Sequence, residues 1–283
     1  MKIKEKCLPC MVNQAIKTAN MVNAADRETL YKKIFAQMSE MDFSMTTPEV
    51  VGDSNEIIKA HVGCDDPYRE VKAHYNRLFY EKLGEYDAKI GTFSEAVKYA
   101  IAANIIDFNP VHVNVAEEME RVFGSIDTLG LTVDDSDKLE ADVRSATTLL
   151  YLGDNCGEIC FDKLLIGHIK KVNPECKVYY GVRGAAVIND NTVEDALSVG
   201  MDEVATVISN GDHSPATVLS RVSEEFHAVF DSADVVISKG QGNFETLNDS
   251  GREIYFMLMA KCEVVAEELG VPLKSLICKK SRA

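Results

Sequence analysis

The sequence predicts an α/β fold in which a helical N-terminal domain, residues 1–145, packs on a Rossmann-like three-layer α/β/α domain, residues 146–283, with a mainly parallel sheet. The first part has apolar residues at helical spacing. The second part alternates short apolar runs with amphipathic stretches, the pattern of a parallel sheet wound with helices. Segments rich in glycine and polar residues follow those apolar runs, where parallel sheets bind their ligands.

The helices of the first part are indicated by apolar residues three or four positions apart. We expect them over Met11–Met21, Thr29–Met41, Tyr68–Tyr86 and Ser94–Phe108. The acidic segment Leu131–Asp142 predicts a solvated connection to the second part. It contains Asp135-Ser136-Asp137, which has the spacing of aspartyl-phosphate phosphatases, but with no strand predicted before it we interpret it as linker.

The strands of the second part are short apolar runs. Four are expected at Thr148–Leu152, Lys177–Val182, Glu203–Ile208 and Asp234–Ile237, and a fifth run, Ile254–Ala260, fits a strand or a helix. The segments between the first four predict helices over Glu158–Lys171, Thr192–Val199 and Ser214–Phe226.

Composition excludes several classes of function. The formal net charge of −15 gives an acidic surface that repels phosphate backbones, so we expect no nucleic-acid partner. No apolar run approaches the length of a membrane span, and no signal peptide is evident, so we expect a cytoplasmic protein without membrane association. The eight cysteines are scattered, as expected for thiols or ligands. The sequence gives no indication of oligomeric state.

Oxygen-bearing side chains after the first two runs form a candidate metal site. Asp154 and Asn155 follow the first run and Asp190 follows the second. Carboxylate and amide oxygens with no histidine pair favour a Mg²⁺- or Mn²⁺-type centre over zinc. Each aspartate is also a good helix N-cap. The metal role for Asp190 requires its loop to fold back over Asp154.

Two further loops are candidates for binding an anionic, hydroxyl-rich small molecule. The segment Lys239-Gly240-Gln241-Gly242-Asn243 combines a cation with glycines that let the backbone approach a ligand. Asn210-Gly211 can present backbone N–H groups in the same way. Glu245 is a candidate acceptor for ligand hydroxyls or a capping residue. Neither loop matches the Walker pattern, which needs a Lys-Ser/Thr ending, or the GxGxxG pattern.

Two other features have weaker functional interpretations. Cys7-Leu8-Pro9-Cys10 is either a helix start with ordinary thiols, the interpretation we favour, or half of a metal site that Cys64 or Cys262 completes in space. No strand precedes the motif, which disfavours a thioredoxin-like role. His213 is the only histidine that falls in a loop at the expected binding edge.

Several of these motifs together resemble the damage-control phosphatase family, long known as domain of unknown function 89. The motifs are Cys7-Leu8-Pro9-Cys10, Asp65-Asp66-Pro67-Tyr68, Asn104-Ile105-Ile106-Asp107, Asp154-Asn155-Cys156-Gly157-Glu158, Ile188-Asn189-Asp190 and Lys239-Gly240-Gln241-Gly242-Asn243-Phe244-Glu245. The resemblance spans nearly the whole chain, and the N-terminal CxxC is similar to the mainly prokaryotic subgroup.

The resemblance implies a divalent-metal-dependent phosphatase that acts on small phosphorylated metabolites, with Mn²⁺, Mg²⁺, Ni²⁺ or Co²⁺ as cofactor. It implies that Asp154, Asn155 and Asp190 hold the metal and that Asn104 and Asp107 reach the cleft from the helical part. The Lys239 segment then contacts the phosphate or sugar. As a hypothesis, the cation and Lys239 offset the charge of the phosphate, while either a water molecule, which we favour, or Asp154 itself attacks phosphorus.

Two other classes of protein remain open from the residues alone. A nucleotide- or S-adenosylmethionine-dependent transferase would suit a doubly wound sheet, although the turn Gly153-Asp154-Asn155-Cys156-Gly157 lacks the glycine pattern that such cofactors favour. A non-enzymatic metabolite- or metal-binding protein would use the CxxC to sense the redox state or a metal.

Overall fold

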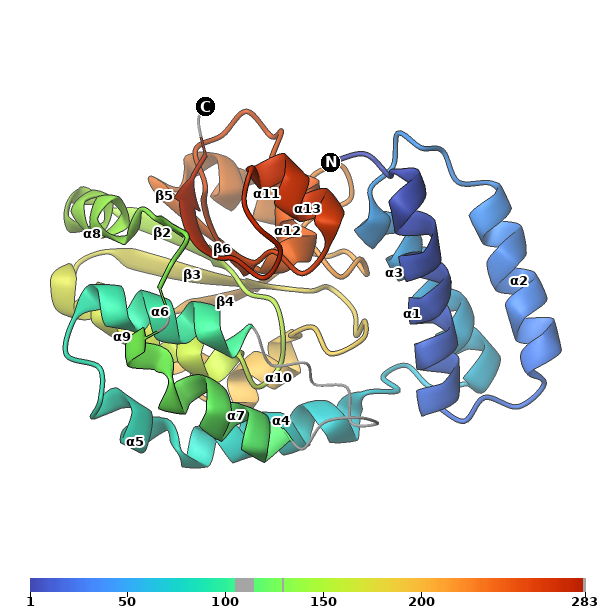
Figure 1. The fold of residues 1–283 in the computed structure, drawn as a ribbon, viewed down its shortest axis with the longest axis horizontal. Coiled ribbons are helices and arrows are strands. Elements are labelled where there is room, and N and C mark those ends of the chain that lie inside the picture. Colours follow the sequence, from blue (N-terminus) through green and yellow to red (C-terminus); the bar gives the residue numbers. More distant parts are fainter. Residues whose placement is uncertain (105–114, 129, 282–283) are drawn as a thin grey trace.

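The computed structural model describes residues 1–104, 115–128 and 130–281, and it confirms the predicted α/β fold (Figure 1). The described residues form one seven-stranded sheet of order β1-β7-β6-β5-β2-β3-β4, in which only the β6–β7 pair is antiparallel. The strands are β1 (Val133–Asp134), β2 (Thr148–Leu152), β3 (Lys177–Val182), β4 (Thr206–Ser209), β5 (Val235–Lys239), β6 (Tyr255–Met259) and β7 (Leu276–Lys280).

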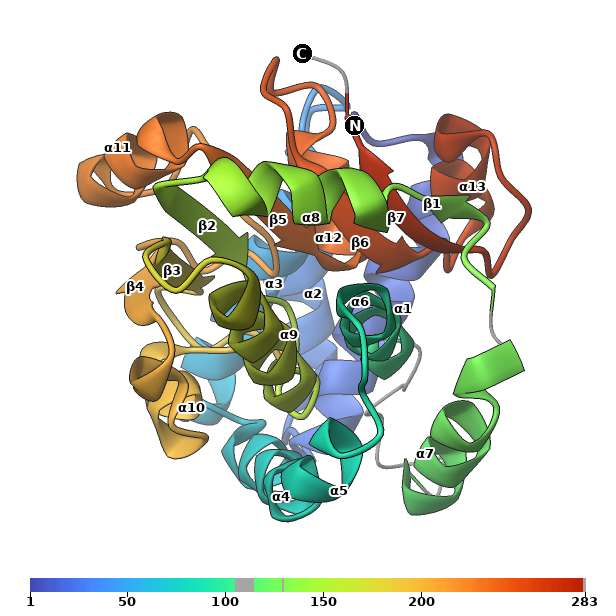
Figure 2. The same cartoon turned by 90° about the vertical axis from the view of Figure 1, so that its left-hand side faces the viewer.

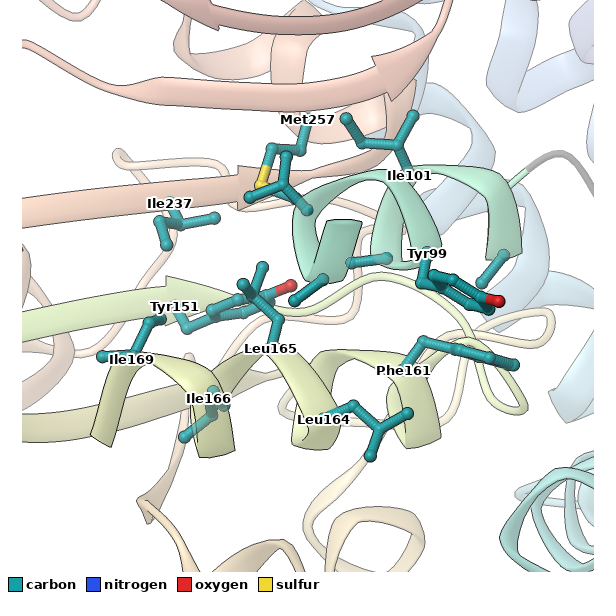
Figure 3. Packing of buried hydrophobic residues seen from close by; sticks show 14 of the residues in the cluster. Tyr99, Ile101, Tyr151, Phe161, Leu164, Leu165, Ile166, Ile169, Ile237 and Met257 are labelled. Atoms are coloured by element: carbon teal, nitrogen blue, oxygen red, sulfur yellow. The ribbon is translucent and has the colours of Figure 1, made fainter. Parts of the chain in front are cut away.

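Helices cover both faces of the sheet, which buries its apolar side chains (Figures 1 and 2). One face packs with α6 (Phe93–Ala103), α8 (Ser136–Ser145) and α9 (Ile159–Val172). Figure 3 shows Tyr151 and Ile237 of the strands facing Leu165 and Ile169 of α9. The opposite face packs with α11 (Glu224–Ser232), α12 (Gly240–Leu247) and α13 (Glu263–Leu269). Because both faces are covered, the central strands are apolar throughout rather than alternating.

Further helices extend the layer that contains α6 and α9. They are α4 (Arg69–Glu81), α5 (Leu83–Asp87), α7 (Val115–Gly124) and α10 (Val193–Ser198). Short 3₁₀ turns occur at Ile126–Thr128 and Met201–Glu203, and another, Glu5–Cys7, precedes α1. The helix expected over Tyr68–Tyr86 is therefore interrupted at Lys82. In the described residues no helix is both long and apolar enough to cross a membrane.

The first three helices form a separate group with its own apolar core (Figure 1). They are α1 (Leu8–Met21), α2 (Arg27–Ser39) and α3 (Thr47–Val62), and α3 packs against α12. Helix α3 was not predicted, because its middle, Gly52-Asp53-Ser54-Asn55, consists of weak helix formers. Its capping box, Thr46 with Glu49, is the local signal that was present.

The expectation of a solvated connection over Leu131–Asp142 was wrong. Val133–Asp134 is strand β1, paired with β7, and α8 begins at Ser136, which is buried. The acidic side chains lie on the exposed side of these elements, and the pairing partner is more than a hundred residues away, so local composition could not reveal it. The division into 1–145 and 146–283 stays a prediction; the sheet itself begins earlier, at β1.

The helix expected over Ser214–Phe226 was also wrong. Residues 214–223 form a loop, and α11 begins at Glu224, where the Ser223 hydroxyl accepts a hydrogen bond from the Phe226 N–H at 3.2 Å. The loop is held by Asn243, whose side-chain oxygen accepts from the Thr217 N–H at 2.7 Å. The Thr217 N–H thus bonds to a side chain of α12 and not to a carbonyl one turn earlier, as it would in a helix. The last uncertain run, Ile254–Ala260, is strand β6.

Candidate active site

The carboxyl ends of β2, β3 and β5 bring the candidate residues together. The loop after β3 folds back over the end of β2, since the Asn191 N–H donates to the Asp154 carbonyl at 2.9 Å and the Cys156 N–H donates to the Asn189 carbonyl at 2.8 Å. Asn155 and Asp190 form an isolated antiparallel bridge. This is the chain arrangement that a shared metal site over Asp154, Asn155 and Asp190 requires.

Asp154 is a nearly buried carboxylate held by two amides. Its Oδ2 accepts hydrogen bonds from the side chains of Asn104, at 2.9 Å, and Asn155, at 2.7 Å. Burial, with the charges of Glu158 and Asp190, raises the pKa of Asp154 to about 8. The side chain is therefore oriented before any ligand arrives, and its charge is poorly compensated by the protein alone.

Lys239 lies in a fully buried ionic cluster with Glu158 and Asp162. Its Nζ donates to Glu158 at 2.5 Å and to Asp162 at 2.6 Å, and none of the three side chains is exposed. Asp162 also accepts from the hydroxyls of Tyr151, at 2.7 Å, and Tyr180, at 2.9 Å. Burial alone would lower the pKa of Lys239, but the charges of Asp162 and Glu158 raise it overall. Its charge is thus engaged by the protein, which places it at the base of the site rather than at a surface open to a phosphate.

Replacing Lys239 by Met should destabilise the protein by about 3–5 kcal/mol, because two buried carboxylates would lose their cation. Chemical denaturation would measure the change in the free energy of unfolding. Lys32→Met is the matched control: Lys32 pairs with Glu28 on the exposed surface, and its loss should cost less than about 0.5 kcal/mol. Equal effects in the two variants would contradict the structural role of the cluster.

Arg183, the first residue after β3, is a second cation that faces the carboxylates, and it was not among the predicted site residues. Its Nε donates to Asp190 at 2.7 Å, and its Nη2 lies 3.7 Å from Asp154 Oδ1. Nη2 is buried and has no hydrogen-bond partner in the described residues. The position of Arg183 directly after the predicted strand Lys177–Val182 could have identified it as a site residue. Glu158 could be found in the same way, three residues after Asn155.

Three of the other predicted ligand contacts, Asn243, Asn210 and Gly211, form hydrogen bonds that hold the loops together. Asn243 is buried and donates to the carbonyls of Gly153 and Lys239, so it joins β2 to β5. The side-chain oxygen of Asn210 accepts from the N–H groups of Gly184 and Asp212, both at 2.9 Å, which fixes the loops after β3 and β4. The N–H of Gly211 donates to the Ser209 hydroxyl at 3.1 Å. The N–H of Gly211 and the side chain of Asn210 are thus engaged in loop structure.

Gln241 and Glu245 face away from Asp154. Gln241 donates to Glu245 at 2.9 Å and to the Cys262 sulfur at 3.5 Å, next to the N-terminal cysteines. Gly240, in contrast, lies directly against Asp154. His213 pairs with Asp53 of α3 at 2.9 Å. Asp107 lies outside the described residues.

The buried charges around Asp154 suit a divalent cation. Four buried carboxylates, those of Asp154, Glu158, Asp162 and Asp190, face two buried cations, Arg183 and Lys239, which leaves an excess of two negative charges when all are ionised. The side-chain oxygen of Asn104 is buried, with no hydrogen-bond partner in the described residues. Oxygen donors and unbalanced negative charge are the features that a hard cation prefers.

The stability of the metal-free protein should therefore fall as pH rises from about 4 to about 8. Asp154 ionises near pH 3.8 in the unfolded chain but near pH 8 in the folded one, so the folded state holds the extra proton and loses stability as that proton leaves. Thermal unfolding in chelator across this range would show the decline. Asp154→Asn should flatten it, and added Mn²⁺ should stabilise more strongly at high pH. If stability fell equally steeply with pH in the native protein and in Asp154→Asn, Asp154 would not be the group that causes the decline.

The fold and the site together define a class: an α/β protein with buried acidic side chains at the carboxyl edge of its parallel strands. Comparison with known proteins gives the particular family. Residues 3–277 match the damage-control phosphatase ARMT1-like domain. The damage-control phosphatase PH1575 of Pyrococcus horikoshii is 34% identical, over 100% of this chain and 99% of that protein. A damage-control phosphatase of Archaeoglobus fulgidus is 33% identical over 77% of each chain.

A solved structure agrees over the same span. The crystal structure of a DUF89 family protein from Pyrococcus horikoshii superposes with a TM-score of 0.91 at 33% identity and covers 100% of both chains. The chain belongs to the damage-control phosphatase ARMT1-like domain family. The predicted family and the predicted class of enzyme, a phosphatase, are confirmed.

Proposed function

We propose that this phosphatase hydrolyses phosphate monoesters of small metabolites, such as sugar phosphates or damaged phosphometabolites, in the cytoplasm, and that it requires Mn²⁺, Mg²⁺, Ni²⁺ or Co²⁺. The observation that carries the proposal is a set of four buried carboxylates, Asp154, Glu158, Asp162 and Asp190, that outnumber Arg183 and Lys239, the two cations among them; the Nη2 of Arg183 has no hydrogen-bond partner in the described residues. The carboxylates suit the cation, and the guanidinium suits a phosphate oxygen.

Asp154, Asn155 and Asp190 are the residues that would hold the ion. A divalent cation bound there would withdraw charge from the phosphate and help to activate the attacking group. Asn104 holds the Asp154 carboxylate through Oδ2 at 2.9 Å and also donates to Glu158 at 2.9 Å. The amide thus fixes the relative positions of two acidic side chains.

Arg183 is the group that would bind the phosphate. Asp190 anchors it through Nε, so its Nη2 is fixed in direction and can offset charge that develops on a phosphate oxygen. Lys239 would act indirectly, by neutralising Glu158 and Asp162 at the base of the site. The resemblance implies a phosphate contact for Lys239; we propose that Arg183 takes that role instead.

Asp154 is better suited to hold the ion than to attack phosphorus. Two amides hold its Oδ2, and burial in an acidic cluster raises its pKa, so in the metal-free protein little of the carboxyl is in the ionised form that could attack near pH 7. These contacts support attack by water. A phosphorylated Asp154 recovered after rapid quench would contradict that choice.

Turnover of a panel of phosphate monoesters, assayed with each of the four metals and with chelator, tests the proposal. We expect release of inorganic phosphate only with metal, and loss of activity on chelation that added metal restores. Undiminished release in chelator would contradict the metal requirement. Binding of S-adenosylmethionine without phosphate release would favour a transferase instead.

A further inference from the structure

Three of the eight cysteines line one cavity away from the candidate active site. The cavity has a volume of about 490 Å³ and lies where the start of α1 meets α12 and α13. Cys7 and Cys10 reach it from the N-terminal end of the chain, and Cys262 reaches it from the residue before α13. The side chains of Gln241 and Glu245 complete its polar wall.

Specific contacts hold the N-terminal segment in this place, beside α12 and α13 (Figure 1). The amino group of Met1 donates to the Glu245 carbonyl and, at 3.1 Å, to the Asn248 side chain. Lys6 pairs with Glu263 and Glu267, both at 3.0 Å. The CxxC is therefore fixed at the mouth of the cavity.

The three thiols differ in access. Cys10 is exposed and Cys7 is half-buried. Cys262 is half-buried, accepts a hydrogen bond from Gln241 at 3.5 Å, and has a pKa that burial raises, so it stays a protonated thiol. The reactive form of cysteine is the thiolate, and access decides which thiol meets a reagent first. Cys10 is thus the entry point, and Cys7 is its neighbour.

Cys7 and Cys10 also lie within one helical turn of each other. They lie three residues apart where a 3₁₀ turn runs into α1. Residues three apart in a helix have Cβ atoms about 5–6 Å apart, and a disulfide needs about 3.8 Å. The first turn of α1 has to tighten by about 1–2 Å for the bond to form.

We propose that Cys7 and Cys10 form a dithiol site that reacts reversibly with low-molecular-weight disulfides through this cavity. The Cys10 thiolate attacks one sulfur of the small disulfide, forms a mixed disulfide and expels one thiolate. The Cys7 thiolate then attacks the Cys10 sulfur and expels the second thiolate. The two cysteines are oxidised, the small disulfide is reduced to two thiols, and the two protons pass from the protein thiols to the leaving groups.

Glutathione redox buffers applied to the full chain test the proposal. After equilibration, free thiols are alkylated and tryptic peptides are weighed. The peptide Cys7–Lys17 carries both cysteines, and we expect it to become lighter by two hydrogen atoms and to lose both alkylation sites. Cys7→Ser should trap glutathione on Cys10, and Cys10→Ser should abolish the internal bond. Both positions are near the surface, so serine there should leave the fold intact.

Cys64→Ser is the matched control, because Cys64 is exposed and does not line the cavity. It should leave the midpoint of the titration unchanged. Two results would overturn the proposal. One is separate glutathione adducts on Cys7 and Cys10 with no internal bond, at the same potential as on Cys64. The other is a zinc or iron ion, seen by native mass spectrometry, that protects Cys7, Cys10 and Cys262 from alkylation.

Discussion

Replacing Asp154 by Ala should lower phosphatase turnover by a factor of about 10³ or more while the protein stays folded. Removal of a ligand carboxylate weakens the ion and its effect on the phosphate, and 10³ corresponds to about 4 kcal/mol of lost transition-state stabilisation. The fold should tolerate the change, since the carboxylate is destabilising in the metal-free protein at neutral pH: burial raises its pKa to about 8.

The measurement pairs steady-state turnover at saturating metal with thermal unfolding in chelator. Asp234→Asn is a suitable control, because Asp234 lies at the opposite end of the central strands, where it accepts from the N–H groups of Thr147 and Thr148 at 2.8 and 2.9 Å. The control should keep turnover within a few-fold. Near-normal turnover in Asp154→Ala would refute the metal assignment, and an unfolded Asp154→Ala would refute the electrostatic account of its stability.

The sequence reveals the edge of the sheet at which the site forms, because strand ends can be read locally. Asp154, Asn155 and Asp190 were found from their place after apolar runs, and the structure brings their loops together through the backbone contacts of Asn189 and Asn191. Arg183 and Glu158 satisfy the same positional rule and could have been selected by it. The position of these residues is determined locally, because the chain must turn where a buried parallel strand ends and ligands bind at that edge of the sheet.

The direction of a side chain is harder to predict. Lys239 and Gln241 flank Gly240 in sequence, yet Lys239 points into the ionic cluster of Glu158 and Asp162, while Gln241 points toward Cys262 on the other side of α12. The sequence favoured a phosphate-binding loop there because it contains two glycines and a lysine. Which way each side chain faces depends on where α12 begins, and Asn243, through its bonds to Gly153 and Thr217, helps to determine that.

Long-range pairing accounts for the remaining errors. β1 has only two residues, and its partner β7 lies far along the chain. β7 was missed because its Lys279-Lys280 end is polar, although β6 pairs with it over five residues. The Ser214–Phe226 segment has helical periodicity, but it is used as a loop because Asn210 and Asn243 bind its backbone. In each case the backbone N–H and C=O groups of the segment bond to a residue far along the chain, which the pattern of neighbouring residues does not reveal.

Replacing Gly240 by Ala should abolish most of the activity through geometry alone. Gly240 has a φ of +80°, and an added Cβ would lie 1.9 Å from Asp154 Oδ2 and 2.3 Å from its Cγ. Either α12 or the Asp154 carboxylate must move, because non-bonded atoms cannot approach so closely. A displacement of about 1 Å in a catalytic group can cost a factor of 10² in rate. We expect at least that loss, together with weaker metal binding.

Gly251→Ala is the control that distinguishes the effect of this clash from the effect of backbone strain. Gly251 has a similar φ of +72°, but nothing lies within 4 Å of its added Cβ. It should therefore lose only about 1–2 kcal/mol of stability from the left-handed backbone, with normal turnover. Metal titrations followed by calorimetry, with turnover measured on the same samples, would distinguish the two. Unchanged metal affinity and turnover in Gly240→Ala would mean that Asp154 does not need to occupy this position, and that the ion is held elsewhere.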